Sequence, residues 1–376
     1  MLFALLCGSI WDPDSSNLES STQQGRKRWS ERALCAACIE KGIVDSAERR
    51  VIIMDIEILL WFQNFREATS AWFTSFFSFL TSIAVDYYIL VPALIIFWTV
   101  SKKQGSRILM SWGTALGFGA FLKSTFCVYR PWVRDARIAP PEDIMAGATG
   151  YSFPSGHSFS SGGFWNGVMF TYKKYKGIIV FSIIMVLLTM ISRLYFTVHT
   201  PQDVIVGGLG SLILAFAISK LCNWVDKKDN RDIIVLAVAT VLVIALLLYV
   251  GLKTYPEDYV DGKLLVDPAK MAVDSFKDPG RFYGIILGWF LERRFIKFRV
   301  EATTFQKVMR ALVGGLLVIL WWNAVATPIG KAAGVGIVHF LMQASTPCIF
   351  MTVYPLIFNK IENRIARKGI SAMKII

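Results

Sequence analysis

The sequence predicts an all-α protein, a polytopic bundle of about nine membrane-spanning helices. Hydrophobic residues make up 54% of the 376 residues and charged residues only 18%, whereas soluble domains have about 45–50% and about 25%. The mean hydropathy is +0.49, and apolar runs of roughly 20 residues, enough to cross a bilayer core, recur along most of the chain. Lys and Arg fall in short blocks between these runs, as they do in the loops of membrane proteins.

The first 53 residues differ from the rest of the chain. Their apolar start, MLFALLCGSI, lacks a basic region and is short for a signal peptide, and a polar stretch follows it. Residues 1–53 are therefore expected to form a polar N-terminal extension outside the fold. Residues 54–78 place Ile, Leu, Trp and Phe at helical spacing with charges between them, which predicts an amphipathic helix in the membrane interface.

Nine apolar segments follow in order. The third is short and carries Gly162, Gly163 and Gly167, which permit close helix packing, so we expect it to be buried inside the bundle. The predicted spans are 79–100, 108–126, 158–172, 177–196, 203–223, 232–252, 280–296, 308–327 and 335–358.

The basic connections predict the topology. They occur at every second loop and at the C-terminus, which places them together on the cytoplasmic side. The acid-rich loop 253–279 then lies outside, as does the N-terminus. The net charge of +13 comes largely from these short basic blocks, so nucleic acid is not an expected partner. The basic segments are 101–107, 173–176, 226–231, 292–299 and 359–369.

Ionisable residues gather at the ends of three predicted spans, where such groups are costly and usually functional. All three groups fall on the predicted extracytoplasmic side. The first is KSTFCVYRP, in which Lys123 ends the second span and Arg130 follows seven residues later. Taken alone, Lys123 can simply extend its amine to the membrane interface.

The second group is PSGH, residues 154–157. Pro154 stops any preceding helix and Ser155 is a good N-cap, so a helix is expected to begin here. In one interpretation His157 merely occupies its first turn. In the other, the free backbone N–H groups and the close approach permitted by Gly156 make this helix start an anion site.

The third group is SRLYFTVHTPQDV, which contains Arg193, His199 and Asp203. Asp203 has two interpretations. With Thr200 as N-cap and Pro201 at the first helical position, it resembles the third helical residue of a capping box. It also follows His199 by four residues and can accept a hydrogen bond from that ring, which fixes the tautomer. Both can hold, because a carboxylate has two oxygens.

Together these groups bring cations, two imidazoles and a helix N-terminus to one face of the membrane. The cations suit a dianionic phosphate, Arg by bidentate contact and Lys as a point charge. The imidazoles suit nucleophilic and acid–base chemistry near neutral pH. No dense carboxylate set accompanies them, which disfavours a two-metal site; Glu142 and Asp143 are the one nearby pair. Neither a metal nor a cofactor is expected.

The motifs K-x6-R-P, P-S-G-H and S-R-x5-H-x3-D resemble the signature of the type-2 phosphatidic acid phosphatases. All three are complete and in order between Lys123 and Asp203. The resemblance implies a six-helix phosphatase-like core, residues 79–252. The loop 253–279 joins this core to about three further transmembrane helices and a basic cytoplasmic tail, residues 280–376. This longer layout is more similar to the glucose-6-phosphatase branch, or to the sphingosine-phosphate phosphatases, than to a minimal lipid phosphatase.

The resemblance also implies a metal-independent phosphatase with a phosphohistidine intermediate. His199 would attack phosphorus, while Asp203 orients the ring and stabilises its charge. His157 would protonate the leaving oxygen and then activate water. The groups that would bind the phosphoryl oxygens are Lys123, Arg130, Ser155, the Gly156 amide and Arg193.

The expected activity is hydrolysis of a phosphomonoester or diphosphate of a lipid at the extracytoplasmic or lumenal face, with membrane lipids as the other partner. A small soluble ester such as a sugar phosphate, or phosphoryl transfer to another lipid, is an alternative at the same site. A transporter or channel is a third alternative. Against it, the ionisable residues cluster at one end of the spans rather than at the midplane. Substrate identity and oligomeric state are left open.

Overall fold

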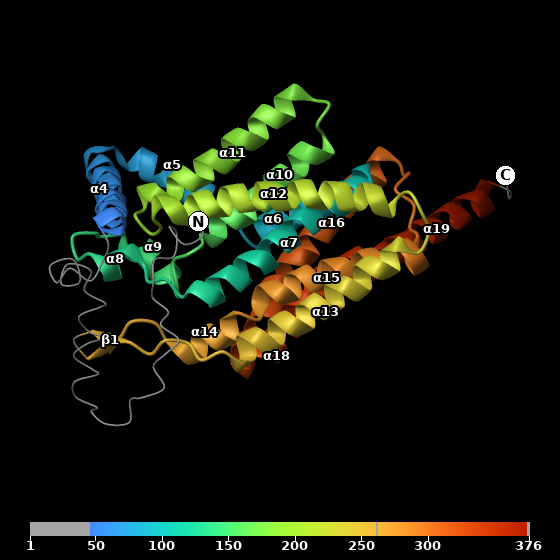
Figure 1. Cartoon of the computed structure of the whole chain (residues 1–376). Coiled ribbons are helices and arrows are strands. Elements are labelled where there is room, and N and C mark those ends of the chain that lie inside the picture. The colour runs from blue at the N-terminus through green and yellow to red at the C-terminus, as the bar shows by residue number, and fades with distance from the viewer. Residues whose placement is uncertain (1–45, 261, 374–376) are drawn as a thin grey trace.

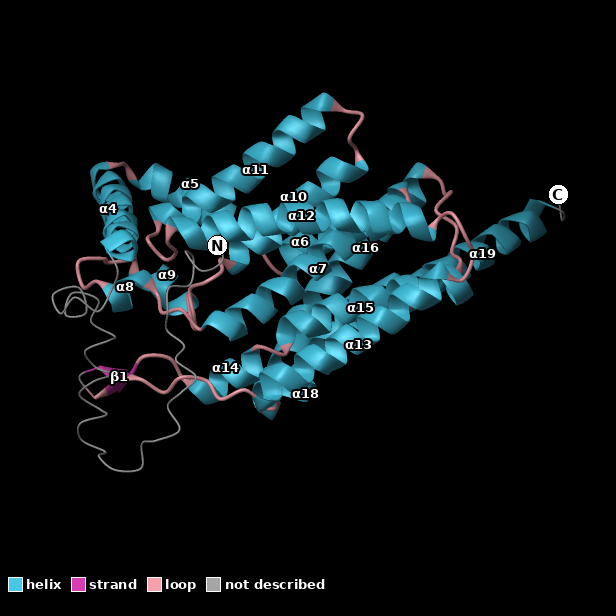
Figure 2. Ribbon diagram, viewed as in Figure 1, coloured by secondary structure: helices cyan, strands magenta, loops and turns pink. Residues whose placement is uncertain are grey.

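The protein is described here by a computed structural model that covers residues 46–260 and 262–373. Over these residues it is a bundle of helices with one small antiparallel hairpin (Figures 1 and 2). The predicted all-α fold class is confirmed. Of the predicted N-terminal extension, residues 1–45 lie outside the described residues.

The N-terminal segment forms two helices and then a broken one. Where the sequence predicts one interfacial helix, the structure has α4 (Ser46–Ala68) and the start of α5 (Ala71–Ser82). The predicted span 79–100 is divided between the end of α5, α6 (Tyr87–Ile95) and the π-helical turn η1 (Ile96–Val100). The chain bends by 61° between α5 and α6, and Asp86 at the break has a positive φ of 54°.

The central helices are α7 (Lys102–Phe126), α10 (Gly156–Thr171), α11 (Lys176–Tyr195), α12 (Pro201–Val225) and α13 (Arg231–Leu252). Helix α10 packs against α7, α11 and α12, and most of its residues are buried, as its glycines predict. A Cβ placed on Gly163 would lie 2.7 Å from the Cβ of Ala115 on α7. Small residues thus allow α10 to occupy the middle of the bundle.

Short elements lie in two long connections. Helices α8 (Pro131–Arg134) and α9 (Glu142–Gly147) lie between α7 and α10. Strands β1 (Tyr259–Val260) and β2 (Lys263–Leu264) and helix α14 (Pro268–Asp274) follow α13. In Figure 1 the hairpin lies at the same end of the bundle as α4, α8 and α9.

The C-terminal helices complete the bundle, and α15 packs between α7 and α18. A Cβ on Gly284 would lie 2.1 Å from the Ala344 carbonyl oxygen, so α15 and α18 approach at backbone distance. Side chains of α15 and α18 share one apolar core with α6, α7 and α10. The elements are α15 (Lys277–Leu291), η2 (Glu292–Ile296), α16 (Thr304–Trp321), η3 (Trp322–Ala326), α17 (Thr327–Ala333), α18 (Gly336–Met351) and α19 (Val353–Met373).

Five helical stretches within the described residues are long and apolar enough to cross a membrane, and a sixth is added if the bent pair α5 and α6 counts as one span. Helices α10 and α15, with 16 and 15 residues, are shorter than a typical span, and α7 mixes Ser, Thr and Gly with its apolar residues. The total of nine spans therefore stays a prediction. The five are Lys176–Tyr195, Pro201–Val225, Arg231–Leu252, Thr304–Ala333 and Gly336–Arg364.

Three of the basic connections meet at one end of the bundle. Asp226, which follows the last residue of α12, lies 2.8 Å from Lys103 Nζ, 3.1 Å from an Arg107 nitrogen and 3.3 Å from an Arg293 nitrogen. Helix α7 starts at this end and has 25 residues, so its far end lies about 37 Å away at 1.5 Å per residue. Lys123 is in the last turn at that far end.

Candidate active site

Lys123 connects the K-x6-R-P motif to the segment that precedes the P-S-G-H motif. Helix α7 is followed by its C-cap, Cys127, whose left-handed φ of 48° turns the chain away from the helix axis. Lys123 Nζ donates to the carbonyl oxygen of Tyr151 at 2.8 Å and contacts that of Ser152 at 3.4 Å. The end of α7 is thereby joined to the segment that leads into PSGH.

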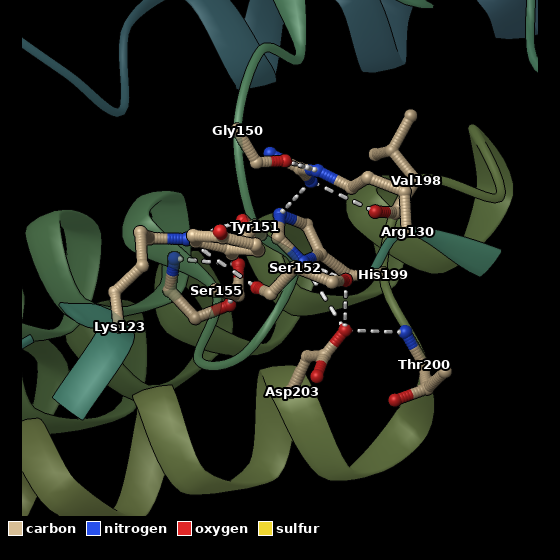
Figure 3. Close-up of polar contacts among 11 residues, drawn as sticks. Lys123, Arg130, Gly150, Tyr151, Ser152, Ser155, Val198, His199, Thr200 and Asp203 are labelled. Carbon is tan, nitrogen blue, oxygen red and sulfur yellow. Dashed lines mark hydrogen bonds and ion pairs between the residues drawn. The ribbon is translucent and has the colours of Figure 1, made fainter. Parts of the chain in front are cut away.

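Arg130 contacts all three motif regions. It lies just before Pro131 at the start of α8 and is buried. Its Nε donates to the Gly150 carbonyl at 3.1 Å, and its Nη1 donates to the Val198 carbonyl at 2.9 Å and to His199 Nε2 at 3.0 Å (Figure 3). Burial lowers the pKa of Arg130 to about 10, and the guanidinium stays charged at neutral pH.

Helix α10 begins at Gly156, as the PSGH motif predicts. Ser155 is its N-cap, and the Ser155 side chain accepts a hydrogen bond from the Ser158 amide at 3.3 Å. Gly156 is exposed, and a Cβ there would meet nothing within 4 Å. The first amides of a helix have no partner within the helix, so the Gly156 amide can face a ligand.

One oxygen of Asp203 serves both functions considered from the sequence. Asp203 Oδ2 accepts from the Thr200 amide at 2.9 Å, which completes the capping box of α12. The same oxygen lies 3.3 Å from His199 Nδ1 and accepts from the Ser152 hydroxyl at 2.5 Å (Figure 3). The start of α12 and the orientation of the His199 ring therefore depend on one carboxylate oxygen.

The contacts of His199 determine its tautomer. A guanidinium only donates, so the Nε2 that faces Arg130 carries a lone pair, and the ring proton is on Nδ1 toward Asp203. Burial and then the positive charges of Arg130, Arg193 and Lys123 hold the pKa of His199 well below its ordinary value. The ring is neutral at physiological pH, and the lone pair on Nε2 accepts the hydrogen bond from Arg130.

Arg193 is buried close to the same centre. Its Nη1 donates to the Thr81 hydroxyl at 2.6 Å, and among the described residues its Nε has no hydrogen-bond partner. His157 is half-buried at the start of α10 and has no hydrogen bond to another described residue, although the charges of Arg193, Arg130 and Lys123 act on it. Each imidazole and cation that the motifs predict is thus part of one cluster.

Two polar contacts of the site were missed by the sequence analysis. Ser152 lies between Asp203 and His199 Nδ1, at 2.5 and 3.3 Å, and Thr81 holds Arg193 from α5, 112 positions away in sequence. Ser152 stands two positions before Pro154, and Thr81 stands near the end of α5. Neither residue carries a sequence signal that separates it from an ordinary one. Glu142 and Asp143, in contrast, are exposed on α9.

The arrangement is suited to an anion. Three cations share the site with one carboxylate, and none of the three makes an ion pair among the described residues, whereas a dianionic phosphate would satisfy them. Among those residues no three His, Cys, Asp or Glu side chains are grouped to hold a metal ion.

Comparison with protein families gave two adjacent matches. A family model described as the PAP2 superfamily matches residues 104–231, which contain every predicted site residue. A second, described as PAP2 superfamily phosphatase, transmembrane extension, matches residues 276–368, from the end of the hairpin connection into α19. No curated protein and no solved structure matched the chain.

Proposed function

The chain belongs to the PAP2 superfamily and carries the transmembrane extension of its phosphatases, and from that premise we propose that it hydrolyses the phosphate ester of a membrane lipid through a phosphohistidine intermediate. The observation that carries the proposal is the neutral His199 ring held between Asp203 and Arg130. One ring thereby meets a carboxylate that orients it and a guanidinium that can bind the phosphate it attacks.

In the first step His199 Nε2 forms a bond to phosphorus and the ester P–O bond breaks. A phosphoryl oxygen replaces Nε2 as the acceptor of the Arg130 N–H, which frees the lone pair for attack. The ring gains positive charge, and Asp203, which already faces Nδ1, stabilises it. The bound phosphate dianion offsets the positive charges around His157, so this ring carries an extra proton in the complex. His157 donates that proton to the leaving oxygen, and the alcohol departs.

In the second step water attacks the phosphohistidine. His157, now neutral, takes a proton from the water. The P–N bond breaks, inorganic phosphate leaves and His199 returns to its neutral form. Lys123, Arg130 and Arg193, with Ser155 and the Gly156 amide, stabilise the phosphoryl oxygens through both transition states.

An apolar pocket beside the site supports a lipid substrate. It has a volume of about 190 Å³ and lies between α5, α6, α10 and α11. Ser161 and Thr189 line it and contact each other at 2.9 Å. They stand four residues from His157 and Arg193, about one helical turn or 6 Å along each axis. An alkyl chain on a phosphate bound at the site can enter this pocket, whereas a sugar phosphate leaves it empty.

The location of the site supports activity at the extracytoplasmic or lumenal face. The basic connections around Asp226 mark the opposite end of α7 and α12, and basic loops face the cytoplasm in membrane proteins. The C-terminus is then cytoplasmic.

Phosphate release by the purified full chain in excess EDTA tests the proposal. We expect release from long-chain lipid phosphates, much slower release from glucose phosphate, and none in His199→Ala. With a ³²P-labelled substrate that has a good leaving group, His157→Ala should accumulate an acid-labile phosphoenzyme, because its second step lacks a base. Full activity in His199→Ala, or a strict need for added divalent metal, would overturn the mechanism. Label recovered on an acceptor lipid would assign a phosphotransferase instead.

A substitution in the pocket tests whether it binds the alkyl chain of the substrate. Met185 lines it, whereas the neighbouring Ile184 is exposed on the outer face of α11. Met185→Trp should raise KM for long-chain phosphates and leave short-chain esters unaffected, and Ile184→Trp should change neither. Equal effects of the two substitutions would argue against a chain-binding pocket.

A further inference from the structure

The connection between α13 and α15, residues 253–276, packs on the outer side of the site. Its apolar residues form one cluster with residues that flank the motif cations. It also bonds to the end of α7, where Ser124 donates to the Ser275 hydroxyl at 3.1 Å and Lys253 Nζ donates to the Thr125 carbonyl at 3.2 Å. The cluster consists of Tyr151, Tyr255, Val266 and Met271, with Cys127, Tyr129 and Ala272 packed against it.

Two extended segments lie between this connection and the proposed catalytic groups. One contains Val128 and Tyr129, and the other contains Tyr151 and Ser152. They run beside each other, and the Ser152 amide donates to the Val128 carbonyl at 2.7 Å. Side chains alternate between the two sides of an extended chain. Tyr129 and Tyr151 accordingly face the 253–276 connection, while the next residue of each segment, Arg130 or Ser152, faces His199 and Asp203.

Tyr129 makes a side-chain hydrogen bond to the connection. Its hydroxyl donates to Asp258 Oδ2 at 2.5 Å. Asp258 itself is held just before β1, where its carbonyl accepts from the Leu265 amide at 3.0 Å. The Tyr129 ring also lies 5.8 Å from that of Tyr151.

Met271 makes a second contact, to Gly150. Gly150 has a φ of +78°, and a Cβ there would lie 2.5 Å from Met271 Sδ. The carbonyl of Gly150 is the acceptor of Arg130 Nε. The connection therefore holds both Tyr129, the residue before Arg130, and Gly150, one of its hydrogen-bond partners.

We propose that Tyr129 and Asp258 are positioning residues: their hydrogen bond couples the 253–276 connection to Arg130 and sets where that guanidinium meets the phosphoryl group. This rests on the proposed phosphatase function. The residue that receives the bond lies outside the region matched by the PAP2 superfamily model, so part of the catalytic geometry is set by the segment that leads into the transmembrane extension.

Tyr129→Phe and Asp258→Asn test the coupling. Each keeps the packing volume and removes or weakens one hydrogen bond. We expect kcat/KM to fall by about 10- to 100-fold, the loss that a misplacement of roughly 1 Å produces, and the inhibition constant of orthovanadate to rise with it. The thermal unfolding midpoint should change little.

The chain offers a matched control on the same connection. Tyr259 is exposed and donates to Glu257 at 2.8 Å, so Tyr259→Phe also removes a Tyr–carboxylate bond but one with no contact to the site. It should leave kcat/KM and vanadate inhibition at the values of the unmodified chain.

A double-mutant cycle separates positioning from general stabilisation. If Tyr129 acts through Arg130, Tyr129→Phe should have little further effect on vanadate inhibition in an Arg130→Lys background. Additive losses, or a Tyr129→Phe variant as active as Tyr259→Phe, would overturn the inference. An unmodified chain that hydrolyses no phosphate ester would instead overturn the proposed function, and the two failures are therefore distinguishable.

Discussion

Two buried arginines of this protein have nearly the same exposure and very different partners. Arg310 on α16 is 2% exposed and Arg193 on α11 is 3% exposed. Arg310 forms a two-pronged contact with Glu362, at 2.9 and 2.7 Å, and also donates to the carbonyls of Trp98, Arg299 and Val300. Arg193 donates only to the hydroxyl of Thr81 among the described residues.

The difference separates Arg310, a structural cation, from Arg193, which we propose binds the substrate phosphate. A buried charge is costly unless it is paired, and Glu362 meets that need for Arg310 within the bundle. Among the described residues, Arg193, Arg130 and Lys123 form no ion pair with a carboxylate. In the proposed reaction the phosphate supplies the missing negative charge. Because the buried cations are unpaired without it, they favour the binding of a dianion.

Removing Arg310 should have the largest effect on stability. Arg310→Met leaves Glu362 without its partner, and we expect the free energy of unfolding to fall by about 3–5 kcal/mol, measured by thermal or denaturant unfolding in detergent. The double variant Arg310→Met, Glu362→Leu should recover most of the loss. Activity per folded molecule should be unchanged. An unaltered unfolding midpoint would contradict the structural role of Arg310.

Arg193→Met should affect activity rather than stability, the reverse of Arg310→Met. Arg193→Met removes an unpaired charge, so stability should hold or rise, while kcat/KM should fall about 10²- to 10³-fold because one donor to the phosphoryl group is lost. Phosphate-release assays and the unfolding midpoint check this on the same preparation. A less stable variant with full activity would assign Arg193 to structure instead.

The pH profile sharpens the comparison further. Burial and then the charges of Arg130, Arg193 and Lys123 hold the pKa of His199 below its ordinary value, so the proposed nucleophile stays neutral as the pH falls through 6.5. In Arg193→Met this pKa rises, and the acid limb of kcat/KM should move to higher pH. Arg193→Lys, which keeps the charge, should leave the limb in place when measured with the same substrate.

The smallest effect is expected at the opposite end of the molecule. Asp226 pairs with Lys103, Arg107 and Arg293 near the surface, where ion pairs contribute about 1 kcal/mol or less. Asp226→Asn should lower the unfolding free energy by no more than that and leave kcat unchanged. A large loss of activity would mean that this end of the bundle controls the site.

The parts of the site that the sequence predicts are those built from neighbouring residues. Ser155 and Gly156 start α10, and Thr200 with Asp203 starts α12, because helix caps act within three or four positions. His199 and Asp203 are likewise one turn apart. These signals are local, so they can be recognised in the sequence without knowing how the helices pack.

The parts that the sequence analysis missed depend on contacts over long separations. Ser152 meets Asp203, and Thr81 meets Arg193 across 112 positions. The break after α5 was also missed, because residues 83–86, IAVD, contain no glycine or proline and continue the apolar pattern. Such features follow from packing between helices, which local propensity does not encode.

The acidic residues at the two ends of α12 indicate how deep His199 lies in the bilayer. Asp203 lies at the start of this helix and Asp226 just after its end, and the 23 positions between them (226 − 203) span about 35 Å, slightly more than the roughly 30 Å hydrocarbon core of a bilayer. When Asp226 and its cations lie among the headgroups of one leaflet, His199 lies among those of the other. The phosphorus atom of a lipid resides at that level, so the lipid phosphate proposed as substrate would reach His199 without leaving its leaflet.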